Sequence, residues 1–156
     1  LIILNKLIKK YPFNLFLLET KADLLFKNGF TNEAKSFYEK VLNKNTENKY
    51  LLKNIFEISY DSFKNSTNYE ISDKFFYENS QLLLVFSDDL MLLNKYNEMA
   101  INLDKIDWIN FINNIKTKKD NSKKINIDNF KKILNNTKDE KLKKITKQMI
   151  KKLNNA

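Results

Sequence analysis

The stretch that decides the fold is residues 15–48, which read LFLLETKADLLFKNGFTNEAKSFYEKVLNKNTEN. Apolar residues recur every three or four positions on both sides of Gly29, the spacing of α-helices with one buried face. Gly29 is the single glycine of the chain, and it stands where a residue with positive φ ends a helix. The stretch therefore predicts helices over residues 15–28 and 32–44, joined by a tight turn, with Thr31 offering an N-cap hydroxyl.

The composition excludes most other fold classes and much familiar chemistry. The chain has 156 residues, 42% of them hydrophobic, which is enough for a domain with a sizeable core. It contains no cysteine and no histidine, which excludes disulfide scaffolds, thiolate nucleophiles, Ser-His-Asp triads and the usual zinc sites. One glycine and one proline exclude phosphate-binding glycine loops and leave few turns for a β-fold. The predicted fold class is all-α.

The sequence has an internal period of 34 residues. Shifting the chain by this length places the apolar residues of segment 4–8 on those of segment 38–42. The first of these segments must end its helix before Pro12, and Gly29 stands at the turn between the helices predicted for residues 15–28 and 32–44. A period of 34 residues is the signature of helix-turn-helix arrays.

Residues 15–48 resemble a tetratricopeptide repeat. Ala22 and Ala34 stand where the paired helices of that family approach closely, and Leu25 and Tyr38 stand at its filler positions. The resemblance implies antiparallel helix pairs stacked into an α-solenoid. The alternative is an unrelated helical hairpin.

The match weakens beyond residue 48, and this weakening defines the predicted organisation. Residues 1–115 are predicted to form a tetratricopeptide-like repeat domain, with residues 49–82 as a degenerate repeat. Residues 116–124 contain no apolar side chain and predict a polar loop. Residues 125–156 predict a pair of basic, amphipathic C-terminal helices.

Several later helices have recognisable start signals. Two of the signals are capping boxes, in which a threonine is followed by a glutamate three residues later, and the others are single polar N-terminal residues. The predicted starts are Thr67 with Glu70, Ser87 with Asp88 and Asp89, Asp107, and Thr137 with Glu140.

The positive charge is concentrated in the last quarter of the chain. Residues 116–156 hold 14 lysines against four acids, a net charge of +10, whereas the whole chain carries +9. Such a segment is either an ordinary solvated helix face or an arm that binds anionic membrane or nucleic acid. The absence of arginine disfavours the specific nucleic-acid alternative, because arginine supplies the bidentate contacts to phosphate and guanine.

The tetratricopeptide resemblance implies a concave groove lined by the first helix of each pair. Aromatic and acidic side chains dominate this set, a composition suited to an extended peptide or a helix of neutral or basic character. Alternatively, Phe26 and Tyr60 pack on a following helix. The predicted groove residues are Phe16, Glu19, Asp23, Phe26, Lys27, Tyr50, Lys53, Asn54, Glu57, Tyr60 and Asp61.

Carboxylate pairs are the remaining catalytic candidates, and they fit other roles better. Asp88 and Asp89 are adjacent, so they point in different directions on a helix. Glu19 and Asp23 share a helix face but suit a binding groove better than a glycosidase pair. We therefore expect no enzyme activity, no cofactor, no metal and no small-molecule substrate. The expected partner is a protein or peptide.

A narrower family resemblance covers the first repeat. Residues 11–29, YPFNLFLLETKADLLFKNG, look like the repeat entry in the C-terminal tetratricopeptide tails of Gram-negative periplasmic zinc metalloproteases that assist outer-membrane protein assembly. The resemblance implies that the chain is the non-catalytic repeat region of a larger, truncated protease. Its location would then be the periplasm, and otherwise the cytoplasm.

Overall fold

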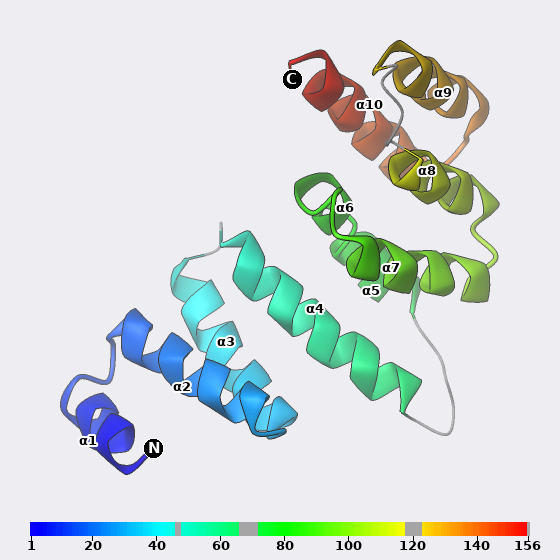
Figure 1. Ribbon diagram of the computed structural model, residues 1–156. Coiled ribbons are helices and arrows are strands. Elements are labelled where there is room, and N and C mark those ends of the chain that lie inside the picture. Colours follow the sequence, from blue (N-terminus) through cyan, green and yellow to red (C-terminus); the bar gives the residue numbers. More distant parts are fainter. Residues whose placement is uncertain (46–47, 66–71, 118–122, 156) are drawn as a thin grey trace. The chain divides into compact units, whose positions relative to one another are not determined.

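The computed structural model describes residues 1–45, 48–65, 72–117 and 123–155 (Figure 1). These residues form ten α-helices and contain no strand, which confirms the predicted all-α fold class. None of these helices is long and apolar enough to cross a membrane. The helices belong to two compact units that divide between Tyr69 and Glu70.

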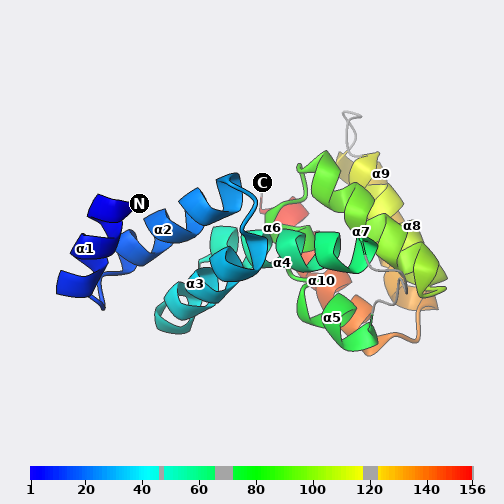
Figure 2. The ribbon, with the colours of Figure 1, turned by 90° about the horizontal axis from the view of Figure 1, so that it is seen from below.

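The first unit contains four helices. The helices of the predicted hairpin, α2 and α3, lie side by side and run in opposite directions (Figure 2), and α1 packs on α2 while α4 packs on α3. The four helices are α1 (Ile2–Lys10), α2 (Leu15–Lys27), α3 (Thr31–Lys44) and α4 (Lys49–Lys64). The two helices predicted by residue range, at 15–28 and 32–44, are confirmed as α2 and α3.

The turn between α2 and α3 is a Schellman motif. Gly29 has φ +86°, its N–H donates to the carbonyl of Phe26 at 3.1 Å, and the N–H of Phe30 donates to Leu25 at 2.9 Å. A Cβ built on Gly29 meets nothing within 4 Å, so only the backbone conformation requires glycine. The predicted N-cap was wrong: Thr31 is already helical, and the cap position is Phe30, which makes no side-chain cap bond.

The core of the first unit joins α2, α3 and α4. Ala22 and Ala34 are both completely buried, one on each helix of the hairpin, as expected where two helices approach closely. The buried members of this core are Leu18, Ala22, Leu25, Ala34, Tyr38, Val41, Leu51 and Ile58.

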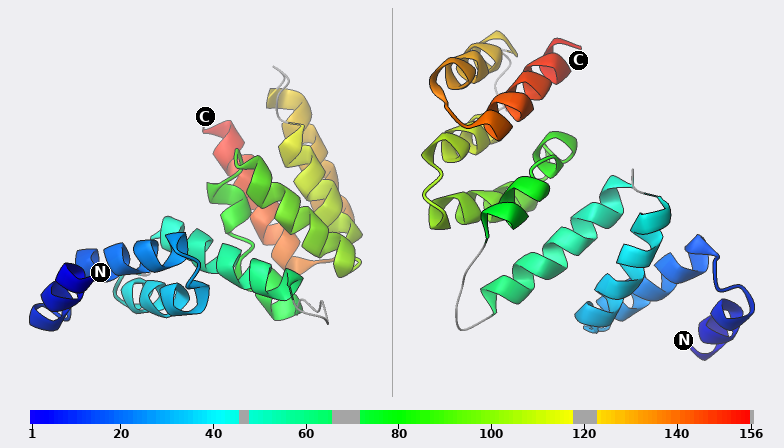
Figure 3. Two further views of the ribbon diagram at one scale, coloured as in Figure 1. Left: turned by 60° about the horizontal axis from the view of Figure 1, so that its bottom comes forward. Right: turned by 180° about the vertical axis from the view of Figure 1, so that it is seen from behind.

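The described residues of the second unit form six helices; Figure 3 draws them in green through red. Neighbouring helices along the chain pack together from α7 through α10, and α10 also contacts α6 and α8. The six helices are α5 (Asp73–Glu78), α6 (Leu82–Val85), α7 (Leu90–Asn102), α8 (Ile106–Lys116), α9 (Lys123–Asn136) and α10 (Glu140–Asn154). The predicted loop at 116–124 is shorter than expected at both ends, because α8 includes Lys116 and α9 begins at Lys123; residues 118–122 lie outside the described ranges.

The two C-terminal helices are part of the core of the second unit. Phe130 of α9 is 2% exposed, and the apolar stripe of α10 is buried against α6, α8 and α9. The division between the units therefore differs from the expected organisation, which kept residues 1–115 together and separated residues 125–156. The physical reason is that α9 and α10 bury their apolar faces on the helices that precede them.

Aromatic side chains fill the centre of the second unit. The ring centroids of Phe76 and Trp108 are 5.0 Å apart, as are those of Phe76 and Tyr96. Trp108 continues to Phe111 at 6.1 Å, and Phe111 to Phe130 at 5.4 Å. These distances are those of favourable aromatic pairs, so one chain of rings links α5, α7, α8 and α9.

Five helix starts have side-chain caps. In each case the side-chain oxygen accepts a bond from a backbone N–H at the start of the helix, and the capping residues are Asn14, Asn48, Ser72, Asp89 and Asp139. Three of the predicted start residues, Ser87, Asp107 and Thr137, therefore do not cap a helix. The N-cap position of α8 is Lys105, and Asp107 lies inside the first turn of that helix. Ser87 is buried and accepts a bond from Lys152, and Thr137 donates to Asp107. The predicted capping box of residues 67–70 lies outside the ranges that the structure describes.

Candidate functional site

Two helices of the first unit carry the predicted groove residues. On α2, Phe16 is 75% exposed, and on α4, Tyr50 is 72% exposed, so both offer aromatic surface to a partner. Phe26 is half-buried and packs against the core. Tyr60 is 3% exposed, so its ring offers no surface to a partner.

Tyr38 of α3 lies close to both helices that carry the groove residues. Its hydroxyl donates to Oδ1 of Asp23 on α2, and Asn54 on α4 lies near enough to lower the pKa of this hydroxyl. Burial raises the pKa of Tyr38 well above its usual value of 10.0, and the hydrogen bond and charge of Asp23 and the charge of Glu19 raise it further. The phenol therefore stays neutral, and it holds the Asp23 carboxylate at the surface of the unit.

Of the predicted residues, Asp23 is bonded to Tyr38, and Glu19 and Asn54 lie near enough to shift the pKa of its hydroxyl. Tyr38 had been predicted as a filler between helices, and its hydroxyl adds a polar role. The remaining predicted residues lie on the same two helices: Lys27 and Asp61 are exposed, and Lys53 and Glu57 are half-buried.

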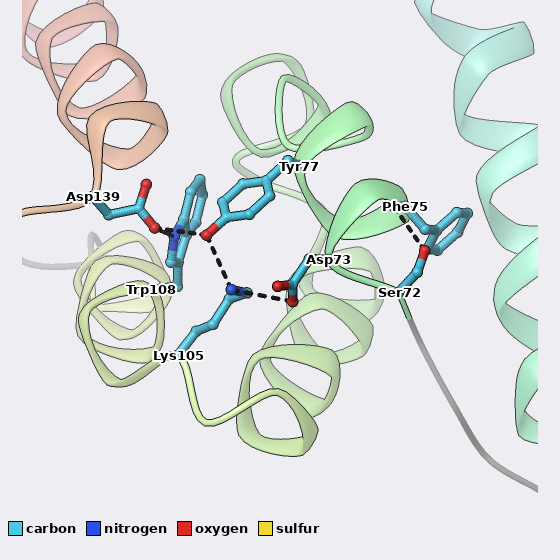
Figure 4. Close-up of polar contacts among 7 residues, drawn as sticks. All are labelled: Ser72, Asp73, Phe75, Tyr77, Lys105, Trp108 and Asp139. Atoms are coloured by element: carbon cyan, nitrogen blue, oxygen red, sulfur yellow. Dashed lines mark hydrogen bonds and ion pairs between the residues drawn. The ribbon is translucent and has the colours of Figure 1, made fainter.

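A polar network that the sequence did not predict lies in the second unit (Figure 4). Oδ2 of Asp139 accepts bonds from the Tyr77 hydroxyl and from Trp108 Nε1, both at 2.9 Å. Lys105 Nζ donates to the Tyr77 hydroxyl at 3.0 Å and lies 3.3 Å from Oδ1 of Asp73. The partners are 28 to 62 residues apart along the chain, so no local spacing in the sequence indicates them.

The electrostatics of this network favour a structural role. Burial raises the pKa of Tyr77. Burial alone would lower the pKa of Lys105, but its hydrogen bond to Tyr77 and the nearby Asp73 outweigh burial, so the pKa of Lys105 is raised. Burial alone raises the pKa of Asp139, but hydrogen bonds from Trp108, the backbone and Tyr77 outweigh it and lower the pKa. All three pKa values shift away from neutral pH. Near pH 7, Tyr77 therefore stays neutral, Lys105 stays positive and Asp139 stays negative, so these three groups do not form an acid–base pair.

Neither a metal cluster nor a known relative points to a function. Within the part of the chain that the structure describes, no group of three or more histidine, cysteine, aspartate or glutamate residues could hold a metal ion. Comparison of the chain with protein families, curated proteins and solved structures found no match.

Proposed function

We propose that the first unit is a protein-interaction module that binds an extended peptide or a helix, neutral or basic in character, along α2 and α4. The observation that carries this proposal is the position of the Asp23 carboxylate, which the Tyr38 hydroxyl holds at the surface by a hydrogen bond. Exposed aromatic rings, Phe16 on α2 and Tyr50 on α4, lie on these two helices.

This arrangement suits peptide recognition for two physical reasons. Phe16 and Tyr50 offer rigid apolar area with few rotatable bonds to order, so little entropy is lost when a partner covers them. Asp23 is already hydrogen-bonded in position, and such preorganisation lowers the cost of binding. Its negative charge, together with that of Glu19 one helical turn away, favours a basic partner over an acidic one.

The same proposal includes a tetratricopeptide-like arrangement of the helix pairs. The glycine-closed turn at Gly29 and the complete burial of Ala22 and Ala34 support it. The resemblance of residues 11–29 to the tails of periplasmic metalloproteases extends the proposal to a non-catalytic repeat region of a larger protein in the periplasm.

The test is selection of peptide ligands on the full chain. A random twelve-residue phage library is panned, the enriched peptides are synthesised, and their dissociation constants are measured by fluorescence anisotropy. We expect enrichment of lysine and apolar residues. We also expect Phe16→Ala and Tyr50→Ala to weaken binding about tenfold each, as for buried aromatic anchors.

Two further variants make the result specific to this surface. Asp23→Asn keeps the acceptor for Tyr38 and removes the charge, so it should weaken basic peptides more than neutral ones. Phe13→Ala is the matched control, because Phe13 is 87% exposed and precedes α2. Equal loss of binding in the control and in Phe16→Ala would contradict the proposal.

A second candidate function is the binding of nucleic acid by α10, and one observation favours it. Leu142, Ile145 and Met149 are at most 1% exposed, so the apolar face of α10 is buried and only its lysine face is available to a partner. An amphipathic helix inserts into a membrane through its apolar face, which here is occupied. Lys144 and Lys151 are exposed on the opposite face.

Salt dependence tests this second candidate. Changing Lys144, Lys147 and Lys151 to glutamine should weaken binding of a labelled single-stranded oligonucleotide and lower the slope of log affinity against log salt. The matched control changes Lys6, Lys9 and Lys44 of the first unit to glutamine. These residues are exposed, and their substitution removes the same net charge. Equal effects of the two triple variants would contradict a local surface on α10.

A further inference from the structure

A cleft of about 370 Å³ lies between α8 and α9. Carboxamide side chains from both helices line it, together with one lysine. These residues are Asn110, Asn113 and Asn114 on α8 and Asn129, Lys132 and Asn136 on α9. Its volume lies within the range of ligand-binding clefts.

One hydrogen bond sets how the two walls of the cleft face each other. The Thr137 hydroxyl donates to Oδ2 of Asp107 at 2.7 Å, which ties the end of α9 to the start of α8. The two helices therefore run antiparallel. Because a helix rises about 1.5 Å per residue, the carboxamides extend over about 6 Å on α8 and about 10 Å on α9. Asn129, Lys132 and Asn136 follow the spacing i, i+3, i+7, which places them on one face of α9.

Buried aromatic packing joins α8 and α9 on the side of the core. Phe111 and Phe130 face the core, and their ring centroids are 5.4 Å apart. Ile133, half-buried, supplies an apolar contact within the cleft. Because the apolar faces of both helices are buried, the asparagine faces remain outward in a fixed arrangement.

The donor and acceptor groups of the cleft indicate the chemistry of its ligand. A carboxamide carries a donor and an acceptor in one plane, the pattern that matches the edge of a nucleobase. Lys132 adds a single positive charge, which suits a phosphate. Asp107, held by Thr137, can accept a hydrogen bond from an exocyclic amine.

We propose that this cleft binds a nucleotide unit of a single-stranded nucleic acid, with the base edge on the asparagines and the phosphate on Lys132. A neutral saccharide would leave Lys132 without a role, and a basic peptide would be repelled by it. Residues 116–156, with their net charge of +10, include the α9 wall and make an anionic polymer the favoured source of the nucleotide. The claim that the nucleotide belongs to a nucleic-acid strand rests on the second candidate function. The claim that the cleft binds a nucleotide does not.

The experiment compares labelled ten-residue oligonucleotides that do and do not carry bases. Oligo(rA), oligo(rU) and an abasic ribose-phosphate chain are titrated into the full chain at two salt concentrations, and AMP is followed by NMR of the asparagine side-chain amides. We expect a base-containing oligonucleotide to bind about tenfold more tightly than the abasic chain, the discrimination of one good carboxamide–base contact.

Variants locate the base-dependent part of the affinity. Asn110→Ala with Asn129→Ala should remove the tenfold preference and leave the salt slope unchanged, because no charge is altered. The matched control is Asn94→Ala with Asn102→Ala, at exposed positions of α7 in the same unit. Lys132→Gln should instead lower the salt slope.

The remaining outcomes separate the two sources of nucleotide and the two proposals. Binding of AMP that shifts the cleft amides, without oligonucleotide binding, supports the cleft for a free nucleotide and rejects the α10 surface. Oligonucleotide binding that depends on Lys144, Lys147 and Lys151 but not on the asparagines overturns the cleft and keeps the α10 surface. Shifts of the cleft amides by maltose, with none by AMP, also overturn it.

Discussion

The two units each contain a helical hairpin, and the two hairpins are closed in the same way. Both α2 and α7 have 13 residues, and each is followed by a three-residue turn. The turn residue with positive φ is Gly29 in the first hairpin, at +86°, and Asp104 in the second, at +53°. In both turns the next N–H donates to a carbonyl five residues earlier at 2.9 Å, from Phe30 in one and Lys105 in the other.

The interiors of these two hairpins differ. The α2–α3 hairpin buries Ala22 and Ala34 with one aromatic ring, Tyr38. The α7–α8 hairpin buries three aromatic rings, those of Tyr96, Trp108 and Phe111, and adds the hydrogen bond from Trp108 to Asp139. The same backbone turn therefore closes an interior with paired alanines and one ring, and an interior with several aromatic rings. The residues at the turn determine how each hairpin closes. The side chains on the facing helices determine how its interior is filled.

The largest expected effect is on the aromatic interior. Trp108 is 1% exposed, and Trp108→Ala should lower the free energy of unfolding by about 3 to 5 kcal/mol, through lost packing and a cavity. Trp108→Phe keeps an aromatic ring and should cost less. Chemical denaturation measures the total effect, and hydrogen exchange should show lost protection in α7 and α8 with protection in α2 and α3 retained. Equal losses in both units would contradict two separately packed interiors.

The alanine interior should be sensitive to enlargement. Ala22→Leu should lower the free energy of unfolding by about 1 to 3 kcal/mol, because Ala22 is completely buried and extra methyl groups force α2 and α3 apart. Chemical denaturation is the measurement. Leucine at the exposed Glu39 of α3 is the control and should be nearly neutral; a neutral Ala22→Leu would reject close packing of this hairpin.

The two turns should respond in opposite directions. Gly29→Ala should cost about 1 kcal/mol, because a side chain is disfavoured at positive φ even where space is open. Asp104→Gly should stabilise by up to about 1 kcal/mol, because it relieves positive φ and removes a negative charge from a helix C-terminus. Asp104→Asn separates the two contributions. The melting temperatures of the three variants are the measurement, and shifts of the same sign would refute the equivalence of the turns.

Acid should weaken the second unit through Asp139. Its pKa in the folded chain lies below the ordinary value of 3.8, so its contribution is fully present above about pH 4 and is lost as the pH falls through the folded pKa. Hydrogen exchange of α8 and α10 between pH 5 and pH 2.5 measures this loss. Asp139→Asn should make their protection less dependent on pH, and an unchanged dependence would contradict the role of this carboxylate.

The sequence predicted part of the candidate peptide site. Glu19, Asp23 and Asn54 were predicted from the repeat frame, and all three act on the pKa of the Tyr38 hydroxyl. Tyr60 was predicted either in the groove or packed on a following helix, and it is buried. Helix periodicity left this choice open because it identifies a face without identifying what covers it. The asparagine cleft was not predicted, since its two walls belong to different helices.

The sequence by itself determined the helices and the turn at Gly29, because each depends on residues within about five positions of one another. Only the tertiary structure decided that Asp139 caps α10 in place of the predicted Thr137, and that its carboxylate also binds Tyr77 and Trp108. It likewise decided that the apolar faces of α9 and α10 belong to the core of the second unit. The physical reason is that these choices depend on which distant side chains are brought into contact, and a single sequence carries no spacing rule for such pairs.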